Sequence, residues 1–185
     1  MPLKITKYFN DSVLLIENIS YLDNRGYFYE IYNKEVFKKL SINTEFVQDN
    51  ISFSKNENTL RGLHFQNPPF AQSKLIQVTR GMIIDIILDI RKNSSTYGKY
   101  LKFKISSEHF QQLFIPEGFA HGFCTLVNNT EVFYKVSNYY SPENEQTIYF
   151  NDKDLSIDWN INTHNVILSE KDKKGLLFND IKSPF

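Results

Sequence analysis

The sequence predicts an all-β protein, a sandwich or barrel of short strands with a few short helices. Phe, Tyr and Trp make up 15% of the 185 residues, and β-branched residues recur among them, a composition that favours strands. Short apolar segments are separated by turn-forming pairs such as Asp23-Asn24, Arg80-Gly81 and Asn128-Asn129. Helical periodicity is confined to two short segments. This combination is typical of a closed or two-layered β fold.

Eight segments combine aromatic and β-branched residues with flanking turns. We expect strands at residues 13–16, 26–31, 46–53, 74–79, 82–90, 100–105, 112–115 and 131–136. Helices are expected at residues 34–40 and 169–174. In the second helix, Ser169 is placed to cap the N-terminus, with Asp172 at the third helical position as in an approximate capping box. Neither helix is long enough to cross between parallel strands, which argues against a Rossmann-type sheet.

Composition limits the organisation and location of the protein. We expect one domain over residues 1–185, because the chain is long enough to bury a core and contains no repeat or convincing linker. Lys plus Arg and Asp plus Glu both number 21, and no polybasic run indicates nucleic acid or an anionic membrane as a partner. No run of about 18 apolar residues predicts a membrane span. The single cysteine, Cys124, excludes a disulfide framework, so we expect a cytoplasmic protein.

Titratable side chains cluster in and between two apolar, glycine-containing segments. The first segment, residues 61–66, contains Arg61 and His64, and the second, residues 115–123, contains His121. Lys74 lies between the two segments. Polar groups set into β-rich sequence predict a lined cavity for a small charged ligand. His64, flanked by apolar residues, is a candidate general base. A hydrogen-bonded core histidine is the alternative, and the two nearby cations make it less favourable.

Three further residues are less informative on their own. Alternation along the expected strand 131–136 makes the Tyr134 phenol available to a cavity, although Tyr134 alone is more typical of a packing residue. Lys171 and Asp172 lie in the second helical segment, where the residues alone favour a solvated helix face.

The histidine spacing bears on a metal site. The four histidines are His64, His109, His121 and His164. None of them forms the His-x-His or His-x-Asp/Glu pair that metal-binding β-barrels use, so the sequence predicts no metal. The spacing does not test a site whose ligands come from distant strands, so a metal-dependent dioxygenase stays an alternative.

Nine strings along the chain, taken together and in order, resemble the dTDP-4-dehydrorhamnose 3,5-epimerase family. They occupy residues 23–30, 48–52, 61–66, 72–75, 89–91, 96–99, 116–123, 134–135 and 168–172. The resemblance implies a double-stranded β-helix, the jelly roll of the cupin type, with a metal-free active site inside the barrel. It also implies a homodimer in which the N-terminal region reaches into the partner.

The implied reaction is epimerisation at C3 and C5 of a nucleotide-linked 4-keto-6-deoxy sugar, in particular dTDP-4-dehydro-6-deoxy-D-glucose to dTDP-4-dehydro-L-rhamnose. Both carbons flank the C4 ketone, so removing either hydrogen leaves an enolate whose charge collects on the C4 oxygen. By the resemblance, His64 is the base and Asp172 orients and stabilises its ring. Lys74 stabilises the oxyanion, and Tyr134 is the acid on the opposite face. No cofactor is expected, because the ketone is the electron sink.

The resemblance also assigns residues that bind a nucleotide-diphosphate sugar. Arg25 and Arg61 are expected at the diphosphate, where guanidinium groups match phosphate oxygens. Tyr140 is expected to stack on the pyrimidine, and Arg25 and Glu30 to enter from the partner subunit. The other binding residues implied are Phe28, Gln48, Asn50, His121, Glu145 and Lys171.

Several alternatives keep part of this account. The same chemistry at one carbon only, or on a GDP-linked 4-keto sugar, would use the same base and acid. The related 3,4-ketoisomerases are disfavoured, because their double-histidine pattern is absent at His64-Phe65-Gln66. A non-catalytic sugar-binding cupin would not need His64, Lys74, Tyr134 and Asp172 together, and their joint presence discriminates against it.

Overall fold

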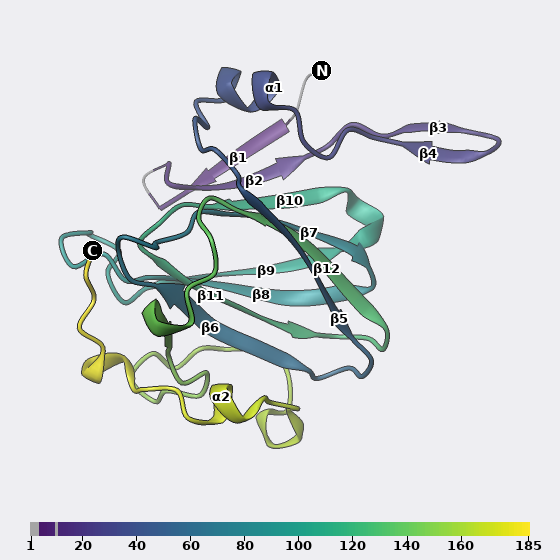
Figure 1. The fold of residues 1–185 in the computed structure, drawn as a ribbon. Helices are drawn as coiled ribbons and strands as arrows, with labels where there is room; N and C mark the ends of the chain where they lie inside the picture. Colours follow the sequence, from purple (N-terminus) through teal and green to yellow (C-terminus); the bar gives the residue numbers. More distant parts are fainter. Residues whose placement is uncertain (1–3, 10) are drawn as a thin grey trace.

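The computed structural model describes residues 4–9 and 11–185, and its strands form two facing antiparallel sheets (Figure 1). The six-stranded sheet has the order β1 (Lys4–Tyr8), β2 (Val13–Glu17), β10 (Gln111–Ile115), β7 (Lys74–Arg80), β12 (Thr130–Val136) and β5 (Gln48–Ser54). The five-stranded sheet has the order β13 (Glu145–Thr147), β6 (Leu60–Gln66), β11 (Phe119–Thr125), β8 (Met82–Asp89) and β9 (Tyr100–Ser106). The predicted jelly roll is confirmed.

The remaining elements lie around the two sheets. A hairpin of β3 (Tyr21–Asp23) and β4 (Gly26–Phe28) projects away from them as an arm (Figure 1). The helices are α1 (Lys34–Lys39) and α2 (Glu170–Lys173), with 3-10 turns at Ser107–His109, Pro142–Asn144, Thr163–Asn165 and Phe178–Asp180. Within the described ranges, no helix combines the length and hydrophobicity needed to cross a membrane.

All eight predicted strands and both predicted helices are present, with some ends displaced. The strand expected at 26–31 ends at Phe28, and the one expected at 46–53 begins at Gln48. Five strands were not predicted: β1, β3, β6, β11 and β13. Every residue of β11 is buried, so this strand has no alternation of apolar and polar positions to reveal it.

Alternation along the strands separates three groups of apolar side chains. On β8, Ile83 and Ile87 point between the sheets, where they pack with apolar residues of β7, β10 and β12. Ile84 and Ile86 point to the outer face, which the C-terminal part of the chain covers with residues such as Trp159. On the outer face of the six-stranded sheet, α1 and its flanking residues form the third group. The interior between the sheets is therefore lined by one face of each sheet, and the β3–β4 arm does not contribute to it.

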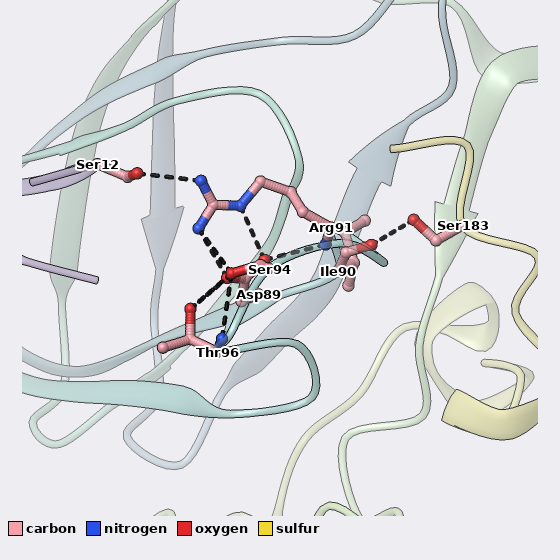
Figure 2. A network of polar contacts seen from close by, with 7 residues as sticks. All are labelled: Ser12, Asp89, Ile90, Arg91, Ser94, Thr96 and Ser183. Carbon is pink, nitrogen blue, oxygen red and sulfur yellow. Dashed lines mark hydrogen bonds and ion pairs between the residues drawn. The ribbon is translucent and has the colours of Figure 1, made fainter. Parts of the chain in front are cut away.

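The segment after β8 is held by a fully buried carboxylate. Asp89 accepts hydrogen bonds from Arg91 Nη2 at 2.7 Å, Ser94 Oγ at 2.7 Å and Thr96 Oγ1 at 2.6 Å (Figure 2). Arg91 Nη1 also donates to Ser12 Oγ at 3.0 Å. Burial opposes ionisation of Asp89, but these donors outweigh it and lower the pKa of the carboxyl group. The network joins this segment to residues near the start of β2 (Figure 2).

Two glycines allow β6 and β11 to approach closely at an irregularity in their pairing. Gly62 has a φ of +120°, and a Cβ on it would lie 2.5 Å from Gly122 Cα and 2.7 Å from the His121 carbonyl oxygen. A Cβ on Gly122 would lie 2.8 Å from the Arg61 carbonyl oxygen. The register shifts at this point, between His121 and Phe123. The two glycines therefore permit the close approach of β6 and β11 that places His64 beside His121.

We expect Gly62→Ala to lower the free energy of unfolding by about 2 kcal/mol more than Gly26→Ala, because only the first variant meets backbone atoms. Gly26 is a matched control, since its φ is +131° but a Cβ there meets nothing within 4 Å. Urea denaturation of both variants measures the difference. Equal destabilisation by Gly62→Ala and Gly26→Ala would show that the close approach of β6 and β11 does not require a glycine at position 62.

Candidate active site

A cavity of about 730 Å³ lies between the two sheets. This volume is in the range of sites that bind small molecules. Eleven of the fourteen predicted site residues line it: Gln48, Asn50, Arg61, His64, Lys74, His121, Tyr134, Tyr140, Glu145, Lys171 and Asp172. The predicted cavity is therefore present, and most of the predicted residues meet in it.

The candidate base and acid come from different sheets. His64 lies on β6 and His121 on β11, which are neighbours in the five-stranded sheet. Lys74 lies on β7 and Tyr134 on β12, which are neighbours in the six-stranded sheet. Because the sheets face one another, a ligand in the cavity has His64 on one wall and Lys74 with Tyr134 on the other.

His64 is paired with a carboxylate that lies 108 residues later in the chain. His64 Nε2 is 2.5 Å from Asp172 Oδ1, and the Asp172 side chain is only 4% exposed. Burial opposes ionisation of Asp172, but hydrogen bonding and the charge of His64, together with a hydrogen bond from Ser169, lower its pKa. Since Nε2 is occupied by Asp172, Nδ1 is the ring nitrogen left to exchange a proton with a ligand.

Lys74 is a partly buried cation beside the candidate base. Its Nζ donates to the His64 carbonyl oxygen at a long distance of 3.5 Å. Burial lowers the pKa of Lys74 to about 8, against the opposing effect of Glu145 and Asp85. Lys74 is therefore still mainly protonated at neutral pH and places a positive charge in the cavity.

Tyr134 presents a neutral phenol to the cavity. It lies between Val132 and Val136 on the inward face of β12. Lys135, the next residue, points the other way and bonds Asp49 at 2.7 Å. Burial raises the pKa of Tyr134, so its hydroxyl keeps its proton at neutral pH. The alternation expected for this strand is confirmed.

Polar side chains at the cavity rim are held in place by hydrogen bonds to one another. Tyr140 Oη and Lys171 Nζ both donate to Glu145 Oε2 at 2.8 Å. Burial raises the pKa of Glu145, but these two partners outweigh it and the net pKa is lowered. Gln48 Nε2 donates to Asn50 Oδ1 at 2.9 Å. This side of the cavity offers an aromatic ring, a carboxylate and amide groups to a ligand.

Arg61 supplies a second cation. Its Nη2 donates to the Phe53 carbonyl oxygen at 3.2 Å and to Ser54 Oγ at 3.4 Å. In the part of the chain that the structure describes, no carboxylate pairs with Arg61. Its positive charge is therefore not neutralised by the protein and is suited to an anionic ligand.

Three predicted site residues lie outside this cavity. Arg25 is on the arm and pairs with Asp23 at 2.6 Å. Phe28 ends the arm with 66% of its surface exposed, and Glu30 accepts from Asn33 Nδ2 at 3.1 Å. A single chain does not bring these residues to His64, and their roles stay predictions.

Sequence reasoning missed Asp85, which lies behind His121. Asp85 is fully buried, its Oδ2 is 2.8 Å from His121 Nε2, and its Oδ1 has no hydrogen-bond partner in the described ranges. Burial lowers the pKa of His121 despite this carboxylate. The available signal was a carboxylate in the middle of the apolar segment Met82–Asp89, at a position that points between the sheets.

The other two histidines lie in 3-10 turns, His109 in Ser107–His109 and His164 in Thr163–Asn165. Over residues 4–9 and 11–185, no three His, Cys, Asp or Glu side chains come together in a group that could hold a metal ion.

We expect Lys74→Met to stabilise the protein at pH 7 by about 1 to 3 kcal/mol. The pKa of Lys74 falls from 10.5 to about 8 on folding, so the unfolded chain binds this proton more tightly. Protonated Lys74 therefore opposes folding, and this effect is complete below the folded pKa. The gain should shrink as the pH rises from about 8 to 10.5. Urea denaturation at pH 7 and pH 10 measures it.

The exposed Lys153→Met is a matched control, and it should change the free energy of unfolding by no more than about 0.5 kcal/mol at either pH. A Lys74→Met variant less stable than the parent at pH 7 would contradict the assignment of Lys74 as a partly buried, poorly compensated cation.

Comparisons with known proteins agree on one family. The family model of dTDP-4-dehydrorhamnose 3,5-epimerase matches residues 10–180. A dTDP-4-dehydrorhamnose 3,5-epimerase of Escherichia coli (strain K12) is 45% identical over 165 residues, covering 89% of this chain and 88% of the relative. The crystal structure of the Bacillus anthracis enzyme of the same name, with TDP and PPi bound, is 44% identical with a TM-score of 0.91, covering 95% of this chain and 99% of that one.

A third relative adds a sugar nucleotide. It is the dTDP-6-deoxy-D-glucose-3,5-epimerase of Legionella pneumophila in complex with dTDP-4-keto-L-rhamnose, 39% identical with a TM-score of 0.92, covering 97% of this chain and 95% of that one. The family match extends over most of the chain, and the TM-scores of 0.91 and 0.92 show that the overall fold is shared. This chain belongs to the dTDP-4-dehydrorhamnose 3,5-epimerase family.

Proposed function

We propose that this protein epimerises C3 and C5 of dTDP-4-dehydro-6-deoxy-D-glucose, giving dTDP-4-dehydro-L-rhamnose. One observation carries the proposal: a carboxylate-paired histidine and a neutral phenol stand on opposite walls of one cavity. Inversion at a carbon requires that a proton leave from one face and another arrive at the opposite face. Family membership supports the substrate class.

The proton transfers follow from the positions of the side chains. Nδ1 of His64 takes the proton from the carbon next to the ketone, and the electron pair of the broken C–H bond moves to the C4 oxygen. Asp172 stabilises the imidazolium that results, while the Lys74 cation stabilises the enolate oxygen. Tyr134 then gives its hydroxyl proton to the carbon from the opposite side. Exchange with solvent restores both groups before the second carbon reacts.

The nucleotide is expected at the rim of the cavity. Tyr140 offers a ring for the pyrimidine, and Arg61 offers an unneutralised cation for the diphosphate. The TDP bound to the Bacillus anthracis relative and the dTDP sugar bound to the Legionella pneumophila relative support dTDP over GDP. No cofactor enters this scheme.

We expect His64→Ala to lose deuterium exchange at both carbons, because it removes the base. Tyr134→Phe should keep part of the exchange but lose inversion by about 100-fold or more, because only the returning acid is missing. Proton NMR of the dTDP substrate in D2O separates exchange from inversion. Unchanged turnover in His64→Ala would remove the proposed base.

The arm is proposed to complete the site of a second copy. We infer that residues 1–185 act as one domain, that two chains form a homodimer, and that Arg25, Phe28 and Glu30 enter the partner's cavity. The supporting observation is that the arm exposes large apolar side chains, Leu22 at 75% and Phe28 at 66%. Residues 1–3 of the N-terminal region lie outside the described residues.

We expect the cytoplasm as the location, since the free, buried Cys124 needs no oxidising compartment.

We expect Arg25→Ala to raise KM for the dTDP sugar by about 10-fold with little change in kcat, because a charge-assisted contact to phosphate is lost. The exposed Arg80→Ala, which removes an equal charge elsewhere, should leave KM unchanged. Light scattering should give the mass of two chains. A monomeric protein in which Arg25→Ala leaves KM unchanged would contradict the shared site.

A further inference from the structure

We propose that Ser169 is a positioning residue for the base, because its hydroxyl holds one carboxylate oxygen of Asp172 while the other oxygen faces His64. The inference rests on the proposed role of His64 and deepens it from a pair of residues to a chain of three. Ser169 was predicted only as a helix cap, and the cap is present: Ser169 Oγ accepts from the Asp172 backbone N–H at 3.1 Å.

The same hydroxyl has a second partner that capping does not require. Ser169 Oγ donates its proton to Asp172 Oδ2 at 2.8 Å, while Asp172 Oδ1 is 2.5 Å from His64 Nε2. Each carboxylate oxygen therefore has a side-chain partner of its own. Within the described ranges, Ser169 is the one side chain that donates to Oδ2. Without it, this oxygen of a carboxylate only 4% exposed would be left without a donor.

The two contacts restrict the carboxylate in different ways. The bond to His64 fixes the distance between Asp172 and the ring, but it leaves rotation of the carboxylate about its own axis open. The bond from Ser169 closes that rotation and keeps the Oδ1 lone pair aimed at Nε2–H. Nδ1 of His64 then stays unprotonated and oriented into the cavity, as a base must be.

A structural role for Ser169 would have a different signature. The neighbouring Lys171 on the same helical turn bonds Glu145 at the rim, 2.8 Å from Nζ to Oε2. If Ser169 only held the turn in place, its loss would disturb Lys171 as well, and substrate binding would weaken. If Ser169 positions the carboxylate, the chemical step slows while KM is retained.

Three substitutions separate the cap from the proton donor. Ser169→Gly keeps a residue that is tolerated at an N-cap but has no hydroxyl. Ser169→Asp keeps a good capping acceptor but replaces the hydroxyl donor by a second carboxyl group, whose charge repels Asp172 Oδ2. Ser169→Thr keeps the hydroxyl and is the matched control. We expect kcat for the dTDP sugar to fall about 10- to 100-fold in the Gly and Asp variants, with KM within about 3-fold of the parent, and Thr to restore kcat.

A direct readout uses the proton in the bond between His64 and Asp172. In protein labelled with ¹⁵N-histidine, this Nε2 proton should give a strongly downfield NMR signal, assigned by its absence in His64→Ala. The signal should persist in Ser169→Thr and shift upfield or broaden in Ser169→Gly and Ser169→Asp. Far-UV circular dichroism confirms that each variant is folded.

Two results would overturn the inference: parental kcat together with an unchanged signal in Ser169→Gly and Ser169→Asp, or a rise in KM with an unchanged signal. The first would show that the donor is dispensable, and the second that Ser169 only supports the turn. If the parent protein does not epimerise the dTDP sugar, the proposed function fails, and the NMR signal still decides whether Ser169 holds Asp172.

Discussion

Strand alternation in two facing sheets is the constraint on which this structure depends. Each strand sends every second side chain into the space between the sheets, and that space must be filled or must serve as a cavity. Ile83 and Ile87 of β8 fill it at one part, whereas His64, Lys74 and Tyr134 line its open part. The same alternation that packs the core therefore points the candidate acid and base inward from opposite walls.

The polar part of this interior is electrostatically unfavourable for folding. Burial lowers the pKa of Lys74 to about 8, and Asp85 Oδ1 lies buried without a partner in the described part of the chain. An apolar core would avoid these penalties. Their location in the cavity, at Lys74, and directly behind it, at Asp85, supports a functional explanation, because the same conditions strengthen the field of a lysine at a developing oxyanion. Stability and catalysis are therefore expected to oppose one another at Lys74.

Much of this arrangement could be predicted from local sequence. Alternation revealed β12 and the inward Tyr134, and the spacing of Ser169 and Asp172 revealed the cap of α2. Long-range pairing could not be predicted from local residues: by itself Asp172 has the pattern of a solvated helix face, although it bonds a histidine 108 residues away. Strand β11 was missed because it is buried throughout, and the role proposed for the arm involves a second chain, which local sequence does not describe.

The central claim is that one cavity exchanges protons on both faces of a 4-keto sugar. The most direct test follows the wild-type protein with dTDP-4-dehydro-6-deoxy-D-glucose in D2O by NMR, recording deuterium and configuration at C3 and C5 of the product. Because the base and acid stand on opposite walls, solvent deuterium should appear at both carbons with both configurations inverted. A product with no solvent deuterium, or deuterium at both carbons with neither inverted, would contradict this account.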